Sequence, residues 1–142
     1  MIDPKAENLN QFFGARAPGL LGLVIDRVTP EAIDGHVDVS SALIAGTGFL
    51  FAPVVVALAD SLAAVGTGEN IDSGAGESFT TIELKCNFLG SAREGERVSG
   101  RCVPVHLGRS THVWDVTVTN DAKDRVIALF RNTQMILRPT AR

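Results

Sequence analysis

The segment APVVVALADSLAAVG, residues 52–66, decides how this chain is expected to fold. Its three consecutive valines favour a strand locally, but residues 52–65 are too many for one strand, and residues 57–64 are rich in helix formers. Pro53 suits the first turn of a helix, and Gly66 suits a helix end. The segment therefore predicts one long helix over residues 52–65. Because it is apolar on nearly every side, we expect it to be buried all round.

Short runs before and after this segment predict β-strands. Residues 23–28 and 33–39 form a pair joined by a turn that contains Pro30. Four longer runs follow the helix, over residues 80–88, 97–107, 111–119 and 125–137. Side chains of a strand alternate between its two faces, and these runs show the alternation of half-buried strands.

The run over residues 80–88 alternates most cleanly. It places one set of side chains on one face, Ile82, Leu84, Cys86 and Phe88, and a second set on the other, Thr81, Glu83, Lys85 and Asn87. In the next run, Pro104 marks a bulge or an edge, because proline has no N–H to give to a neighbouring strand. Turns at Gly108-Arg109 and over residues 120–124 connect the last three runs. The pattern predicts a four-strand antiparallel meander.

Together these elements indicate an α+β fold in a single domain that spans residues 1–142. A helix that is apolar on nearly every side needs cover on most sides, and one curved antiparallel sheet of about five to six strands wrapped around it gives that cover. This arrangement is the hotdog fold. Residues 1–17 are expected to form an N-terminal extension, in which residues 8–13 add a short helix. The edges of such a sheet commonly pair across a two-fold dimer.

The composition narrows the function classes. The net charge of −3 argues against a nucleic-acid or membrane-surface binder, since those carry basic patches. Residues 1–11 are polar, so no secretory signal is expected, and the apolar stretch over residues 49–59 is too short for a membrane span. We therefore expect a cytoplasmic protein. Cys86 and Cys102 lie in strand-like runs without a CxxC motif, so we expect small buried hydrophobes rather than a metal site.

Asp60 is the residue that most needs an explanation. It lies in the middle of the predicted helix, where its neighbours three and four residues away are Val56, Ala57, Ala63 and Ala64. A carboxylate in such surroundings is costly unless it is paired or hydrogen-bonded. Two interpretations stay open: Asp60 is a catalytic base, or it is a structural residue bonded to a strand hydroxyl or across a dimer interface.

Three segments, in order, resemble the acyl-CoA thioesterases of the phenylacetate-degradation (PaaI-like) type. They are GFLFAPVVVALAD (residues 48–60), FTTIELKCNFLGSAREG (residues 79–95) and LGRSTHVWD (residues 107–115). The resemblance covers about residues 18–137. It implies a hotdog enzyme that hydrolyses acyl-CoA thioesters without a cofactor or a metal. It also implies a homodimer or a homotetramer built as a dimer of dimers.

The resemblance also implies roles for individual residues. Asp60 matches the helix carboxylate that activates water or attacks the thioester carbonyl. Ala52 matches the position whose N–H stabilises the oxyanion, where the helix N-terminus favours negative charge. Thr81 matches a residue that orients the water. Further positions implied to contact substrate are Gly48, Phe51, Thr80, Arg109 and Ser110, with Arg109 suited to a CoA phosphate.

Two positions depart from the family pattern. Phe51 stands where the family usually has His, and Ala45 stands where relatives often have Asn or Gln near the thioester. Loss of one such donor costs on the order of 10²–10³ in rate in other enzymes. A non-catalytic acyl-CoA-binding protein is therefore the alternative prediction. A hotdog dehydratase or hydratase is disfavoured, because it needs the His that Phe51 replaces.

Other reactive residues offer weaker sites. His36, His106 and His112 lie in three separate strand runs without the spacing of metal ligands, and we expect His106 and His112 to face solvent. Ser61 follows Asp60, but no G-x-S-x-G elbow surrounds it, so it is expected to pack or cap. Trp114 is expected in the core or at an interface.

Overall fold

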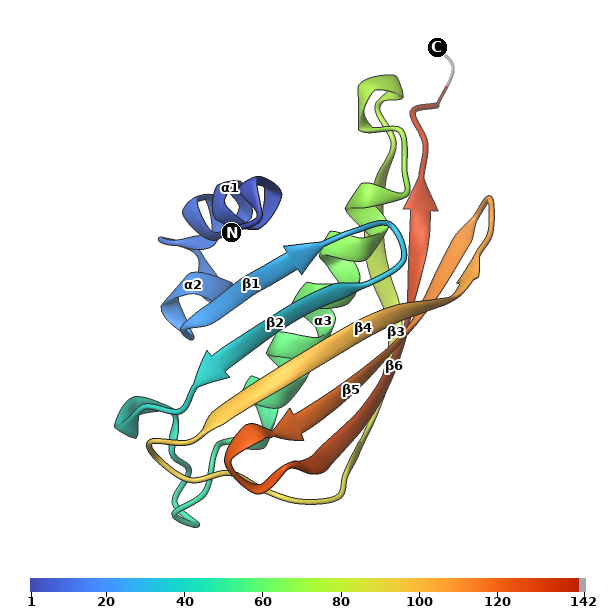
Figure 1. Ribbon diagram of the computed structural model, residues 1–142. Coiled ribbons are helices and arrows are strands. Elements are labelled where there is room, and N and C mark those ends of the chain that lie inside the picture. Colours follow the sequence, from blue (N-terminus) through green and yellow to red (C-terminus); the bar gives the residue numbers. More distant parts are fainter. Residues whose placement is uncertain (141–142) are drawn as a thin grey trace.

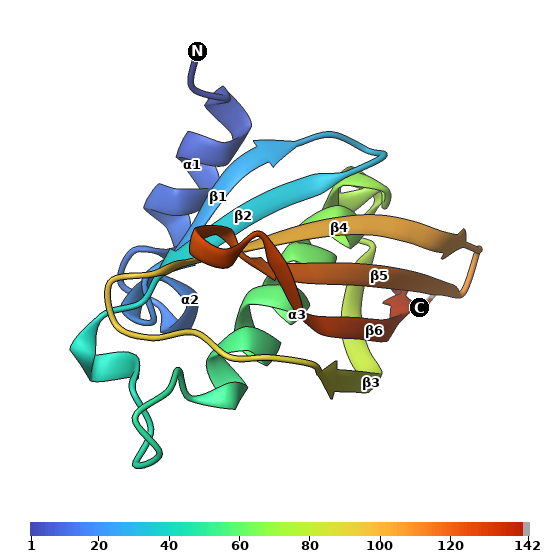
Figure 2. The ribbon, with the colours of Figure 1, turned by 60° about the horizontal axis from the view of Figure 1, so that its bottom comes forward.

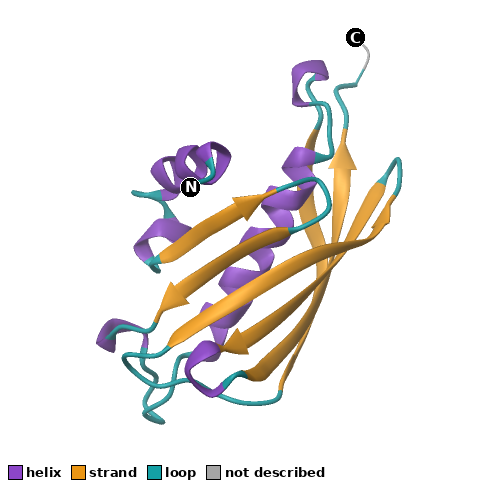
Figure 3. Cartoon of the chain, viewed as in Figure 1, coloured by secondary structure: helices purple, strands orange, loops and turns teal. Residues whose placement is uncertain are grey.

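A computed structural model describes residues 1–140 and shows one helix layer packed on one curved sheet layer (Figures 1 and 3). The helices are α1 (Pro4–Phe13), α2 (Ala17–Leu20) and α3 (Ala52–Glu69). The strands are β1 (Leu23–Val28), β2 (Ile33–Asp38), β3 (Ser78–Phe88), β4 (Arg97–Leu107), β5 (Thr111–Asn120) and β6 (Arg125–Leu137). The predicted α+β hotdog fold is confirmed, and the short N-terminal helix is present in a longer form.

The six strands form one antiparallel sheet in the order β1-β2-β4-β5-β6-β3. The predicted meander is wrong for β3, which pairs with β6 at the end of the sheet, while β4 pairs with β2 and β5. The chain leaves β3 through residues 89–96 and crosses past the start of α3, where the Leu50 N–H donates to the Ala92 carbonyl. Alternation specifies the two faces of a strand but not its neighbours. Pro104 does mark a bulge, as predicted.

Helix α3 ends later than expected. Gly66 lies inside it, and the helix continues to Glu69, where the Asn70 side chain donates to the Gly66 carbonyl at 2.8 Å. A Cβ at Gly66 would lie 2.7 Å from the ring of Trp114, which is buried and donates its indole N–H to the Thr67 hydroxyl. Gly66 is therefore needed for close packing of the helix on the sheet, and its interpretation as a helix stop is wrong.

One side of α3 is not covered by the sheet of its own chain. Leu58, Ala59, Leu62 and Ala63 are fully buried against the concave face of the sheet. On the other side the residues are exposed or only half-buried: Pro53, Ala57, Asp60, Ser61, Ala64 and Gly68. The expectation that the helix is buried all round is therefore wrong for a single chain. The sheet curves over only part of its circumference (Figure 2).

By length and composition, α3 meets the test for a membrane-spanning helix, with a mean hydropathy of 1.2. Half of it is buried inside the fold, and the core helix of a soluble protein passes the same test. The test is therefore weak evidence for a span. The expectation that the chain has no membrane span rests on the stretch over residues 49–59, which is shorter than α3.

The two edges of the sheet differ. Helix α1 closes the edge at β1, because the Asn10 side chain bonds both the N–H and the carbonyl of Ile25 at 2.8 Å. The Asp3 carboxylate adds a bond from the Val28 N–H at 2.7 Å, and this bond lowers the pKa of Asp3. Within residues 1–140, no backbone hydrogen bond is made to the free edge of β3. Four large apolar side chains are exposed along and just after this strand, Ile82, Leu84, Phe88 and Leu89.

Candidate active site

The carboxylate of Asp60 is held by one of its two oxygens. Oδ1 accepts hydrogen bonds from the Thr81 hydroxyl at 3.1 Å and from the Asn132 side-chain nitrogen at 3.0 Å. Oδ2 has no hydrogen-bond partner among residues 1–140. It is not fully buried, so solvent can reach it. The arrangement orients the carboxylate and leaves one oxygen free to accept a proton from water.

A β-bulge brings Thr81 to Asp60. The register of β3 and β6 shifts between Thr81 and Glu83, which makes Ile82 the extra residue. Thr81 and Leu84 both lie opposite buried residues of β6, so both point towards the helix. The expectation that Thr81 and Leu84 lie on opposite faces is therefore wrong. Thr80 pairs with the exposed Met135, so it lies on the outer face, away from Asp60.

The start of α3 offers a free backbone donor. Ala52 is the first helical residue, so its N–H has no acceptor one turn earlier in the helix. Phe51 precedes it as the N-cap, and its side chain makes no cap hydrogen bond. A small hollow of about 160 Å³ lies here, lined by residues that include Ala52, Val55 and Phe88. The Ala52 N–H is therefore available to an oxyanion.

Phe51 and Gly48 shape the approach to this donor. Phe51 is half exposed and lines an apolar hollow of about 340 Å³ with Leu43, Ile44, Ala45 and other residues. Gly48 has a φ of +84°, a conformation that suits glycine, and its N–H donates to the Ala45 carbonyl. The family positions 45 and 51 thus face an apolar surface in this chain.

Within one chain, the Ala52 N–H and the Asp60 carboxylate are too far apart to contact the same carbonyl group. Asp60 lies eight residues after Ala52 on the same helix, and a rise of 1.5 Å per residue separates them by about 12 Å along its axis. A thioester carbonyl that contacts the Ala52 N–H is too far from the Asp60 carboxylate of that chain.

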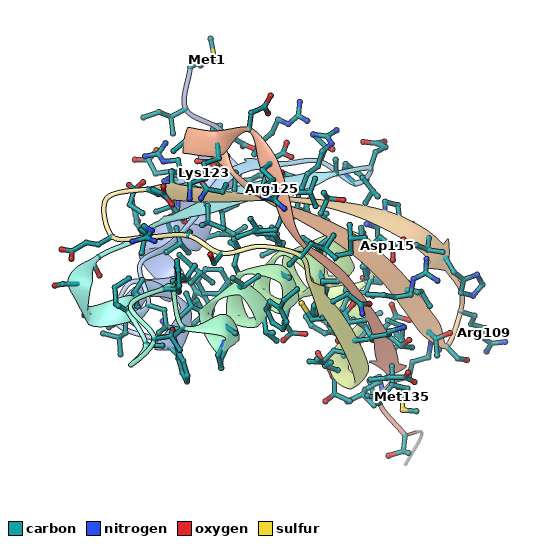
Figure 4. All side chains as sticks on the ribbon, turned by 90° about the horizontal axis from the view of Figure 1, so that it is seen from below. Met1, Arg109, Asp115, Lys123, Arg125 and Met135 are labelled. Atoms are coloured by element: carbon teal, nitrogen blue, oxygen red, sulfur yellow. The ribbon has the colours of Figure 1, made fainter. Side chains whose placement is uncertain are left out.

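Arg109 and Ser110 lie at the other end of the molecule. They form the β4–β5 turn, and Figure 4 shows Arg109 projecting from the tip of this hairpin. A hollow of about 270 Å³ beside this turn is lined by Arg109 and His112 and also by Asn70, just after α3. The predicted site residues therefore form three groups: the start of α3, its middle, and a turn near its end.

Comparison with known proteins decides the family. The family model described as Thioesterase superfamily matches residues 47–127. This chain belongs to the Thioesterase superfamily. It is 30% identical over 131 residues to 1,4-dihydroxy-2-naphthoyl-CoA hydrolase of Escherichia coli strain K12, covering 92% of this chain and 93% of that protein.

Solved structures agree with this assignment. A variant of thioesterase PA1618 from Pseudomonas aeruginosa matches with a TM-score of 0.89 at 28% identity, covering 96% of each chain. A variant of the phenylacetic acid degradation protein PaaI from Thermus thermophilus shares the fold, with a TM-score of 0.75 at 23% identity over 83% of this chain and 96% of that one. The predicted enzyme class, a hotdog hydrolase of the thioesterase type, is confirmed.

Two residues beside Asp60 and Thr81 in this Thioesterase superfamily member were not predicted from its sequence. Asn132 and Gln134 point from β6 towards α3, and both are fully buried. The sequence carries a sign of them, because two amides interrupt a run of alternating apolar residues. The inward-facing positions of β6 are Phe130, Asn132, Gln134 and Ile136. Two amides on a strand face that is otherwise apolar need polar partners. Asp60 and Thr81 supply these partners.

Of the three histidines, His106 is exposed, whereas His36 and His112 are buried. His106 is exposed, as expected, but the expectation for His112 is wrong, because only 4% of its surface is accessible. His112 lies opposite Gln134 on the concave face, and its Nδ1 has no partner among residues 1–140. Burial lowers the pKa of His112, the nearby His106 lowers it further, and Glu77 opposes the shift.

This shift predicts a pH-dependent stability. Above pH 6.5, the ordinary pKa of histidine, His112 is neutral in both the folded and the unfolded chain. Below this pH, the unfolded chain binds a proton at His112 more readily than the folded chain does. The free energy of unfolding therefore falls as the pH drops. Urea unfolding at about pH 7.5 and about pH 5.5 should show a smaller pH dependence for His112→Gln than for the wild type. His106→Gln is the control: it removes only the smaller contribution of His106 to the lowered pKa of His112, so it should keep most of the wild-type dependence. An unchanged dependence in His112→Gln would contradict the assignment.

Proposed function

We propose that this enzyme hydrolyses an acyl-CoA thioester, with Asp60 as the base that activates water. The observation that carries the proposal is the half-buried carboxylate with Oδ1 held by two donors and Oδ2 open. A water molecule gives its proton to Oδ2 while its oxygen attacks the thioester carbonyl. The tetrahedral intermediate then expels the CoA thiolate, which takes the proton from Asp60.

The oxyanion of this intermediate is stabilised by the Ala52 N–H of a second chain. Within one chain the donor and the base are about 12 Å apart along α3, so a two-fold pair is needed to bring one of each to the same carbonyl. The free edge of β3 and the uncovered side of α3 supply the contact surface, since both carry exposed apolar or small residues. The active unit is therefore at least a dimer with two sites.

The ends of the substrate have separate binding groups. Arg109 lies at an exposed turn and forms no ion pair with any residue in the described part of the chain, which leaves its guanidinium for a CoA phosphate, with Ser110 beside it. Phe51 and the apolar hollow at the start of α3 receive an apolar acyl group, aromatic or aliphatic.

The test is hydrolysis of a panel of acyl-CoAs that includes acetyl, hexanoyl, phenylacetyl, benzoyl and 1,4-dihydroxy-2-naphthoyl esters. Loss of the thioester absorbance is followed directly, so that the free, partly exposed thiol of Cys86 does not react with a thiol-specific dye. We expect turnover of at least one aromatic or medium-chain ester. Binding of these esters without hydrolysis would instead support the acyl-CoA-binding alternative, in which Phe51 and Ala45 have removed the chemistry.

A further inference from the structure

We infer that Asn132 and Gln134 are positioning residues for the hydrolytic base: Asn132 holds Asp60 directly, and Gln134 holds it through Thr81. The inference rests on the proposed function of Asp60. It adds two residues of the last strand, far from α3 in sequence, to the machinery of the reaction.

Asn132 has a position that packing alone does not explain. It is fully buried, and its side-chain nitrogen donates to Asp60 Oδ1 at 3.0 Å. Its own side-chain oxygen has no partner among the described residues, which is unfavourable for a buried polar atom. A leucine of similar size would avoid this cost. Among residues 1–140, the one hydrogen bond of the Asn132 side chain is to the Asp60 carboxylate.

Gln134 acts one step further away. The Thr81 oxygen lies 3.1 Å from Asp60 Oδ1 and 3.1 Å from the Gln134 side-chain oxygen, but a hydroxyl has one proton and cannot donate to both acceptors. If the Gln134 amide turns by half a revolution, its nitrogen donates to Thr81, and Thr81 donates to Asp60. The turn also gives a partner to the side-chain nitrogen, which otherwise has none among the described residues.

The result is a directional network that ends on one oxygen of the base. Two donors occupy Asp60 Oδ1, from Asn132 on β6 and from Thr81 on β3. With both in place the carboxylate cannot rotate freely, and the attacking water meets only Oδ2. Removing a donor lets the carboxylate rotate, so the fraction of productive encounters falls while substrate binding is unchanged.

A double-mutant cycle tests this inference. Asn132→Leu should lower kcat about tenfold, the size of one hydrogen bond to a charged group, with KM within about twofold of the wild type. In an Asp60→Asn background, the same change should cause no further loss, because a residue that acts through Asp60 has nothing left to position. An equal loss in both backgrounds, or a loss expressed in KM, would overturn the inference. Gln134→Leu should likewise cause no further loss of kcat in a Thr81→Val background.

A spectrum separates this inference from the proposed function. In a ¹H–¹⁵N spectrum, the side-chain amide signal of Asn132 is assigned by its absence from the spectrum of Asn132→Leu. It should shift in Asp60→Ala, whereas the amide of Asn70, which bonds the Gly66 carbonyl, should not. If the wild type hydrolyses none of the esters, the proposed function fails and this spectrum still tests the contact. If the Asn132 signal stays in place, the positioning role is wrong whatever the activity.

Discussion

Asp60→Asn is expected to reduce kcat by about 10³-fold, within the range for loss of a general base, with little change in KM. Asparagine has the same shape, and its carbonyl oxygen can still accept from Thr81 and Asn132 as Oδ1 does. The atom at the Oδ2 position becomes an amide nitrogen, which cannot take a proton from water. The measurement is steady-state hydrolysis of the best ester in the panel.

Ser61→Ala is the matched control for this change. Ser61 follows Asp60 on the same helix, is half-buried to a similar degree, and points about 100° away around the helix axis. Its loss should leave kcat within about twofold of the wild type, and thermal unfolding should show both variants folded. Turnover by Asp60→Asn close to that of Ser61→Ala would rule out Asp60 as the base.

Ala52→Pro is expected to lower kcat by about 10²–10³-fold, because it removes one oxyanion donor. The substitution suits the backbone, since proline is favoured at the first helical position and Phe51 already has the extended ψ of 118° that precedes a proline. The N–H is lost, and the Cδ of the proline ring takes the place of its hydrogen. Unchanged kcat in a folded Ala52→Pro protein would show that the oxyanion is stabilised elsewhere.

Mixing Ala52→Pro with Asp60→Asn then tests whether two chains build each site. If the base and the donor come from different chains, a mixed dimer has one site with both groups intact, and random exchange should restore about a quarter of wild-type activity. If one chain supplied both groups, every site would lack one of them and no activity would return. Size-exclusion chromatography of the mixture verifies that dimers have formed.

Local patterns predicted the elements of this fold but not their neighbours. The long helix and the strands followed from composition and alternation, and the hotdog architecture followed from their order. The pairing of β3 with β6 did not, because the path of residues 89–96 depends on contacts such as that between Leu50 and Ala92. The helix end at Gly66 was also missed, because the reason for that glycine is Trp114, nearly fifty residues away.

The candidate site was predictable in part for a similar reason. Asp60 was identified because a carboxylate in an apolar helix is unusual. Thr81 was named through resemblance to relatives, while its simple alternation with Ile82 pointed it the wrong way, since a bulge cannot be read from alternation. Asn132 and Gln134 become meaningful only once β6 is known to lie beside β3. The local sign of a polar partner was the presence of two amides between Phe130 and Ile136 on an otherwise apolar strand face.

The capping of β1 by α1 determines how far the sheet can grow. Asn10 and Asp3 occupy backbone groups of Ile25 and Val28 that would otherwise recruit another strand. Each chain therefore has one free sheet edge, and the proposed dimer, if it pairs through β3, would use the free edges of both chains. In such a dimer, the continuous sheet would end at each extremity at an N-terminal helix. We therefore expect the first fourteen residues of the chain to prevent further strands from adding at β1, and so to prevent growth into a fibre.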